Sequence, residues 1–208
     1  AAMQKEMDAL NLLYDRQRKQ YQIARQNVQI INRKCHELKV QIADLRRLQP
    51  DEATTQSLDE AEQAARMYDA NAATGNEVLD VVLTEKSLLC EAQRIRLNCV
   101  ADGTCLAAIE PGDLYALFSN LLDQAIDAAA QQQNDRRMID LLVCRRQGFA
   151  VINVIGPALS GSQPDHGRRH SYELKVARRV VQKYSGAMAT EPRGELFAVK
   201  IVMPLTRG

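Results

Sequence analysis

The sequence predicts an α+β protein, in which a long helical region is followed by a sheet covered by helices on one face. Three observations lead to this expectation. The first fifty residues follow a heptad pattern without Gly or Pro, and the pattern stops at a polar break. From Gly75 onward, helix-period and strand-period segments alternate between Gly- and Pro-containing turns. We therefore expect a helical domain at residues 1–73 and a mixed domain at residues 74–208.

Composition excludes several classes of protein. The 208 residues are 46% hydrophobic and 25% charged, which is typical of a globular protein. A formal net charge of +1 and an aromatic content of 4% without Trp argue against a nucleic-acid partner. The chain has no apolar run near the roughly 20 residues that a bilayer span needs, so we expect neither a membrane span nor a signal peptide within it. The five cysteines lack C-x-x-C spacing, so we expect reduced thiols rather than disulfides or a zinc site.

The first helix carries the strongest pattern. Its inward heptad positions are Met3, Met7, Leu10, Tyr14, Gln17, Tyr21, Ala24, Val28, Ile31, Cys35, Leu38, Ile42, Leu45 and Gln49. Only the two glutamines among them are polar. So long an apolar stripe needs a partner, and the simplest one is a second copy of the helix. The pattern therefore predicts a coiled coil and a parallel homodimer through the first helix.

A second, shorter helix follows Pro50. Its apolar positions are Leu58, Ala61, Ala65, Tyr68 and Ala72. This segment is acidic whereas the first helix is basic, and the opposite charges suit an antiparallel helical hairpin. Two such hairpins would form a four-helix bundle in a dimer.

The C-terminal part reads as a mixture of helices and antiparallel strands. We expect helices at 77–95, 113–132 and 171–184, and strands at 97–100, 105–109, 138–144, 149–155, 187–190 and 196–203. The segment from Gly156 to about Arg169 is expected to be a loop. These elements predict one sheet with helices on one face.

Three segments of this part resemble one family. TGNEVLDVVLTEK (74–86) resembles the entry to the ATPase domain of accessory-gene-regulator-type (AgrC-like) sensor histidine kinases. DLYALFSNLLDQAIDAA (113–129) resembles the asparagine box of the GHKL superfamily. SYELKVARRVVQKYSGAM (171–188) and ELFAVKIVMPL (195–205) resemble the second glycine box, its helix and the closing strands. The resemblance implies a GHKL α/β sandwich behind a dimerisation and histidine-phosphotransfer hairpin.

The same resemblance gives the first helix a possible phosphoacceptor. CHELKV (35–40) stands where the family carries the motif HDxxN. By this resemblance His36 is the phosphoacceptor and Glu37 accepts the proton of its imidazole. The alternative is that His36 is an ordinary surface histidine. Val40 replaces the Asn of the motif, which is an amide expected to order the nucleotide phosphate.

The family's Mg-ATP site is altered in this sequence. Asn120 matches the first Asn of the asparagine box, but Gln124 stands at the second, metal-binding position, and Mg²⁺ tolerates little displacement of an oxygen ligand. Gly156 stands where an Asp or Asn would bind adenine. In the phosphate lid Glu173 replaces a glycine, whereas Lys175 is retained as a cofactor-binding candidate. We therefore expect Mg-ATP to bind weakly or not at all, with Asn120 and Gln124 as the doubtful metal ligands.

These features predict the cytoplasmic part of a peptide-sensing, two-component histidine kinase-like protein with a weakened or lost nucleotide site. The resemblance implies an upstream membrane sensor and a response regulator as partner. An active kinase that phosphorylates its own His36 with Mg-ATP is the first alternative. A dimeric scaffold that binds a response regulator is the second.

Overall fold

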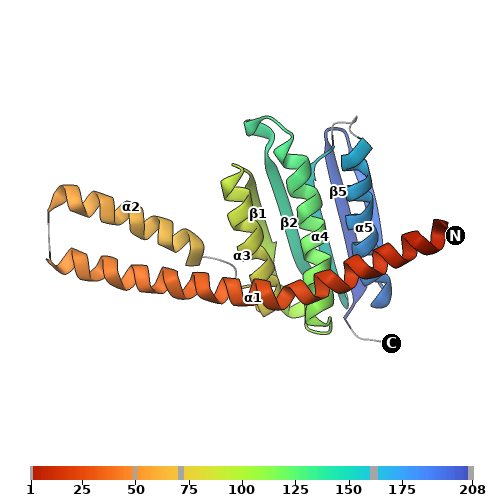
Figure 1. Ribbon diagram of the computed structural model, residues 1–208, viewed down its shortest axis with the longest axis horizontal. Helices are drawn as coiled ribbons and strands as arrows, with labels where there is room; N and C mark the ends of the chain where they lie inside the picture. Colours follow the sequence, from red (N-terminus) through yellow and green to blue (C-terminus); the bar gives the residue numbers. More distant parts are fainter. Residues whose placement is uncertain (1, 49–50, 70–72, 160–163, 206–208) are drawn as a thin grey trace.

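A computed structural model describes residues 2–48, 51–69, 73–159 and 164–205 (Figure 1). Its helices are α1 (Ala2–Leu48), α2 (Glu52–Asp69), α3 (Glu77–Ala92), α4 (Pro111–Ala130) and α5 (Pro164–Lys183). Its strands are β1 (Arg96–Ala101), β2 (Met138–Arg146), β3 (Phe149–Pro157), β4 (Ala187–Arg193) and β5 (Leu196–Pro204). Two 3₁₀ turns are η1 (Gly103–Leu106) and η2 (Asn134–Arg136).

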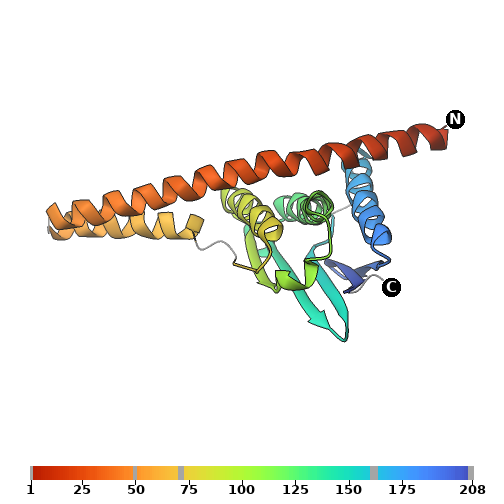
Figure 2. The same ribbon diagram turned by 90° about the horizontal axis from the view of Figure 1, so that it is seen from below.

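The five strands form one mixed sheet in the order β1-β2-β3-β5-β4. The β1–β2 pair is parallel and the other pairs are antiparallel. Helices α3, α4 and α5 cover one face of the sheet (Figures 1 and 2). Alternate residues point to that face, as Ile139, Leu141 and Val143 of β2 do, and all three are buried. The predicted α+β architecture is thus confirmed.

Two predicted boundaries are wrong. Residues 105–109 do not form a strand, because the side chain of Asp102 accepts a hydrogen bond from the backbone N–H of Thr104 at 3.1 Å and closes the turn η1. The expected loop to about residue 169 ends earlier, because the backbone is helical from Pro164. Proline suits this position, since the first turn of a helix needs no intrahelical bond from its N–H.

Helix α1 finds its partners within the chain. Its first half crosses α3, α4 and α5, and its second half runs along α2 (Figure 2). Tyr14, Tyr21, Ala24 and Val28 are buried in the same core as the helices that cover the sheet. For this half of the stripe, the chain itself therefore supplies the apolar partner that a second copy was expected to supply.

The second half of α1 forms the predicted hairpin with α2. Cys35 and Ile42 of α1 are buried, as is Leu58 of α2. Arg46 makes ion pairs with Asp59 and with Glu62, the latter at 2.7 Å, so the basic and acidic helices complement each other. Of the predicted α2 stripe, Leu58 and Ala65 are buried whereas Ala61 is exposed; the side chain of Tyr68 and all of Ala72 lie outside the described residues. Within the described ranges, no helix has both the length and the apolar character required for crossing a membrane.

The first half of α1 is anchored at Asp113, a fully buried carboxylate in the first turn of α4. From α1, the hydroxyl of Tyr14 donates to this carboxylate and Arg18 Nε lies 3.1 Å from it. From α5, Lys183 Nζ donates at 2.6 Å and the hydroxyl of Tyr184 at 2.7 Å. One carboxylate therefore joins three helices.

These donors keep Asp113 ionised. Burial alone raises the pKa of this carboxyl, but the hydrogen bonds from Lys183, Tyr14 and Tyr184 outweigh burial and hold the pKa below its ordinary value of 3.8. Burial and the hydrogen bond to Asp113 raise the pKa of Tyr14 to about 12, so its phenol remains a donor at neutral pH. The cluster is a charge-assisted network at physiological pH.

The stabilisation from Asp113 should depend on pH with a definite sign. Because its pKa is lower in the folded state than the ordinary 3.8, its contribution is complete above pH 3.8 and is lost as the pH falls through the folded pKa. We expect Asp113→Asn to lower the free energy of unfolding at pH 7 by about 1.5–3 kcal/mol. Urea denaturation from pH 7 to pH 3 should show this difference shrinking below pH 4, whereas Asp15→Asn, on the exposed side of α1, should follow the unsubstituted chain. The same difference at every pH would contradict the prediction.

Candidate functional site

Helix α4 places Asn120 and Gln124 on one face. The two residues are four positions apart, so their side chains lie one turn from each other. Asn120 is 1% exposed and Gln124 is 5% exposed, within a helix that is buried along most of its length. The structure thus brings together the two amides that the sequence analysis singled out as metal ligands.

Both polar atoms of the Asn120 amide are hydrogen-bonded within the protein. Its Nδ2 donates to Gln17 Oε1 and to the backbone carbonyl of Ala116, both at 2.6 Å. Its Oδ1 accepts from Gln17 Nε2 at 3.0 Å. Gln17 is one of the two polar residues in the apolar stripe of α1. Its side chain is complementary to Asn120, since each amide both donates to and accepts from the other.

The contacts of Asn120 with Gln17 compete with those that a magnesium nucleotide would make. Mg²⁺ takes oxygen ligands in a nearly ideal octahedron, and Asn120 Oδ1 already accepts from Gln17. Gln124 carries its oxygen on a stem one methylene longer than that of Asn. A ligand at Asn120 would first have to displace α1.

On α5, the charged candidates for a phosphate site face a similar obstacle. Lys175 Nζ pairs with Glu6 of α1, and the hydrogen bond with Glu6 raises the pKa of this lysine. Glu173, which by the family resemblance replaces a glycine of the phosphate lid, is buried and only 8% exposed. The only lysine expected to bind a cofactor is thus paired with a carboxylate of α1.

At the end of β3, Gly156 has no side chain that could hydrogen-bond to an adenine ring. A Cβ built there would lie 3.7 Å from Ala125 Cβ of α4 and 3.8 Å from Ile139 Cγ1, so the position faces the helices and a Cβ would make ordinary van der Waals contacts. Asn153 is three residues earlier and pairs in register with Lys200 of β5. Because side chains alternate along a strand, Asn153 points to the opposite face of the sheet and cannot replace the missing group.

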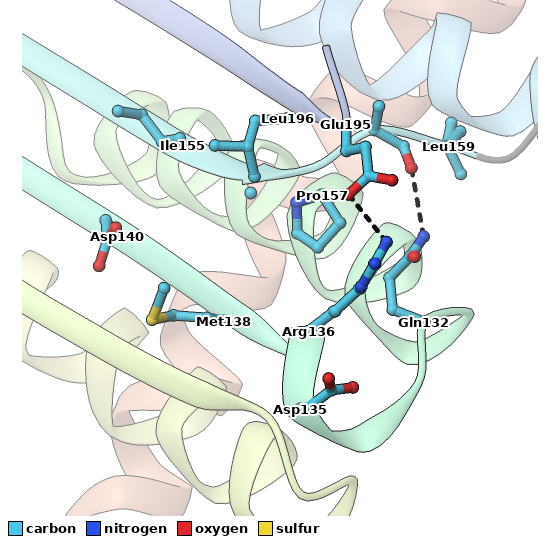
Figure 3. Close-up of a pocket in the computed structure, with 12 residues that line it drawn as sticks. Gln132, Asp135, Arg136, Met138, Asp140, Ile155, Pro157, Leu159, Glu195 and Leu196 are labelled. Atoms are coloured by element: carbon cyan, nitrogen blue, oxygen red, sulfur yellow. Dashed lines mark hydrogen bonds and ion pairs between the residues drawn. The ribbon is translucent and has the colours of Figure 1, made fainter. Parts of the chain in front are cut away.

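A cavity of about 470 Å³ opens at this end of the sheet (Figure 3). Arg136 and Glu195 form an ion pair across it at 2.8 Å, and Gln132 Nε2 donates to the carbonyl of Ala158 at 3.3 Å. Gly156 contributes to its wall. Asn120 and Gln124 are not among the described residues that line it, so this cavity is separate from the site of these two amides.

His36 lies on the hairpin, away from the amides. It is exposed while its neighbour Cys35 is buried, as the heptad pattern predicts. His36 lies nineteen positions after Gln17 on the same helix, which corresponds to about 28 Å at a rise of about 1.5 Å per residue. Glu37 pairs with Lys34 at 2.8 Å, and this hydrogen bond lowers the pKa of the Glu37 carboxyl. The ion pair makes Glu37 a weaker base than expected, because it stabilises the charged carboxylate.

The polar contacts of α1 were not predicted from the sequence. The heptad pattern predicts that Tyr14 and Gln17 face a second copy, whereas in the structure they contact Asp113 and Asn120 of α4. One signal was present, since Gln17 interrupts an otherwise apolar stripe and a buried amide needs a partner. The sequence did not indicate that this partner is Asn120.

The Gln17–Asn120 pair should contribute to stability through the buried amide. We expect Gln17→Leu to leave Asn120 with unmet hydrogen bonds and to lower the free energy of unfolding by about 1–3 kcal/mol. Gln20→Leu makes the same chemical change on the exposed side of α1, and its effect should stay within about 0.5 kcal/mol. Equal effects of the two substitutions in urea denaturation would show that α1 does not pair with Asn120.

Comparisons with known proteins agree with this fold. Residues 109–204 match the family model described as GHKL domain. The catalytic domain of histidine kinase ThkA, in a nucleotide-free form, superposes with a TM-score of 0.50 and 15% identity over 64% of this chain and 96% of that one. Histidine kinase AdeS of Acinetobacter baumannii gives 0.48 and 11% identity over 76% of this chain and 87% of that one. No curated protein matches the sequence.

The family match covers α4, the second to fifth strands and α5, and it therefore includes Asn120, Gln124, Gly156 and Lys175. The likeness to ThkA, at this identity, concerns the fold. Residues 109–204 are a GHKL domain with the fold of histidine kinase catalytic domains.

Proposed function

We propose that the chain is the cytoplasmic part of a two-component, histidine kinase-like signalling protein in which nucleotide binding is weakened or lost. The observation that carries this proposal is the pairing of Asn120 with Gln17, which occupies the asparagine-box amide with a side chain of the protein itself. A domain whose asparagine-box amide is hydrogen-bonded to the N-terminal helix of the same chain is suited to signalling by binding protein partners rather than by rapid ATP turnover.

Departures from the family pattern support the same conclusion. The side chain of Gln124 is one methylene longer than that of the usual Asn, so its amide oxygen is displaced. Gly156 has no side chain to accept a hydrogen bond from the adenine amine. Glu173 is a buried carboxylate in the segment that resembles the phosphate lid. Val40 removes the amide of the histidine motif. Each change removes a favourable contact or adds an unfavourable one, and together they describe a pseudokinase-like site.

The wider role follows from the resemblance to AgrC-like kinases. We propose an upstream membrane sensor for a peptide signal, as in quorum sensing, and a response regulator as the downstream partner. The hairpin supports a homodimer, since Leu38 and Leu45 of α1 are about half exposed beside the buried Cys35 and Ile42. An apolar edge of this kind on a helical hairpin is suited to a four-helix bundle.

Weak nucleotide binding can be measured directly. Losing one charge-assisted hydrogen bond costs about 1.5–3 kcal/mol, and each 1.4 kcal/mol is tenfold in affinity, so two losses turn a micromolar site into one of about millimolar affinity. Isothermal titration with Mg-ATP should therefore show about millimolar binding or none. The variant Gln124→Asn, Gly156→Asn, Glu173→Gly should bind more tightly, and a Cβ at position 156 makes only ordinary van der Waals contacts. Low-micromolar binding by the unmodified chain would contradict the proposal.

A second candidate is an active kinase that phosphorylates His36. The exposure of His36 on the hairpin favours it, because a phosphoacceptor must be reached by a nucleotide held on another part of the protein.

Phosphotransfer, if the chain performs it, should depend on His36 alone among the three histidines. Incubation with γ-labelled Mg-ATP should label the unmodified chain in an acid-labile form and leave His36→Ala unlabelled. His166→Ala and His170→Ala are the matched controls and should retain the label. Equal labelling of His36→Ala and the unmodified chain would remove His36 from the reaction, and no label in any protein favours the pseudokinase.

A further inference from the structure

The first half of α1 contacts the GHKL domain where an anionic ligand of that domain would be bound. Gln17 takes both polar atoms of the buried Asn120 amide. Nearer the start of α1, the carboxylate of Glu6 pairs with Lys175 and the amide oxygen of Asn11 accepts from Arg179. Oxygen atoms of α1 are thus presented to two cations of α5.

These contacts resemble those that a bound phosphate group makes. Lysine and arginine are the usual partners of phosphate oxygens, and here both are satisfied by oxygens of α1. The guanidinium of Arg179 also lies 5.2 Å from the centre of the Tyr14 ring, so its remaining face is covered by α1 as well. An anion that used Asn120, Lys175 and Arg179 would have to replace α1.

Removing α1 would not leave the central buried charge without partners. Asp113 would lose Tyr14 and Arg18, but Lys183 and Tyr184 of α5 belong to the domain itself and would still donate to it. The carboxylate therefore has hydrogen-bond donors with or without α1. This is what a docking contact requires if it is to form and release without unfolding the domain.

We infer that the first half of α1 is a releasable cover of the GHKL domain, and that α1 and a phosphate-bearing ligand bind the Asn120–Lys175–Arg179 surface in mutual exclusion. The inference rests on the proposed function for the identity of the ligand as a nucleotide. By this inference, the position of α1 is a second cause of weak nucleotide binding. This cause is separate from the altered residues Gln124, Gly156 and Glu173. It also gives an upstream signal a direct way to change the domain, since a force on α1 changes access to this surface.

Gly112 provides a way to displace α1 without changing any residue of that surface. It lies in the first turn of α4, and a Cβ built there would be 3.1 Å from Arg18 Cβ and 3.2 Å from Arg18 Nε. A leucine at this position would therefore push against the side chain of Arg18, beginning at its Cβ, and so against α1. Tyr14→Asp is a second opening variant, because it sets a carboxylate against the buried Asp113.

The test uses the variant Gln124→Asn, Gly156→Asn, Glu173→Gly, so that the altered box residues do not mask the effect of α1. Gly112→Leu, Tyr14→Asp and the control Gln20→Leu are each added to it. Mg-ADP affinity is measured by calorimetry, and release of α1 by hydrogen exchange of residues 6–25. We expect both opening variants to speed exchange and to raise affinity at least tenfold, while Gln20→Leu changes neither. Adding Mg-ADP should itself speed exchange in α1.

The outcomes separate the inference from the proposed function. Faster exchange in α1 without a gain in affinity, including the case in which no protein binds Mg-ADP, overturns the mutual exclusion. Mg-ADP binding that leaves α1 exchange unchanged overturns it too, as would opening variants with unchanged exchange and affinity. The proposed function fails instead when the unmodified chain, tested alone, binds Mg-ATP at low micromolar concentration.

Discussion

Two buried polar groups of α4, the carboxylate of Asp113 and the amide of Asn120, determine how the chain is assembled. A buried charge or amide is costly unless it is paired, so the elements that can supply donors must pack against α4. Helix α5 supplies two hydrogen-bond donors to Asp113, and α1 supplies the hydroxyl of Tyr14 as a donor and Arg18 as an ion-pair partner. Gln17 of α1 completes Asn120. The crossing of α1 over the domain follows from these pairings together with the burial of its apolar residues.

The two groups differ in how much they depend on α1. Asp113 keeps two donors from α5 when α1 is absent, whereas Asn120 keeps only its bond to the carbonyl of Ala116. Removal of α1 would therefore leave Asn120 with more unmet hydrogen bonds than Asp113. Asn120 is also the residue that matches the asparagine box of the GHKL domain. The stability of the α1 contact and access to Asn120 are therefore opposed, since any ligand that uses this amide competes with Gln17.

The sheet and its helices could be predicted from the sequence because alternation and helical periodicity are local patterns. The error at residues 105–109 arose from a hydrogen bond of Asp102 that ends the extended run. The partner of α1 could not be predicted, because an apolar heptad is satisfied equally well by a second copy or by another face of the same chain. At the site, the family resemblance identified Asn120, Gln124 and Lys175. The pairing of Asn120 and Lys175 with α1 could not be predicted, because it depends on residues about a hundred positions or more away.

The central claim, that the first half of α1 packs on the GHKL domain of its own chain, can be tested by zero-length carbodiimide cross-linking. Glu6 and Lys175 are in contact and about half exposed, so they are suitable for this reaction. In a mixture of isotopically light and heavy protein, packing within one chain predicts a Glu6–Lys175 cross-link between two light peptides or two heavy peptides. Mixed light–heavy cross-links alone would contradict it. So would the absence of this link in a sample where Lys183 and Glu110, 3.3 Å apart within the domain, are joined.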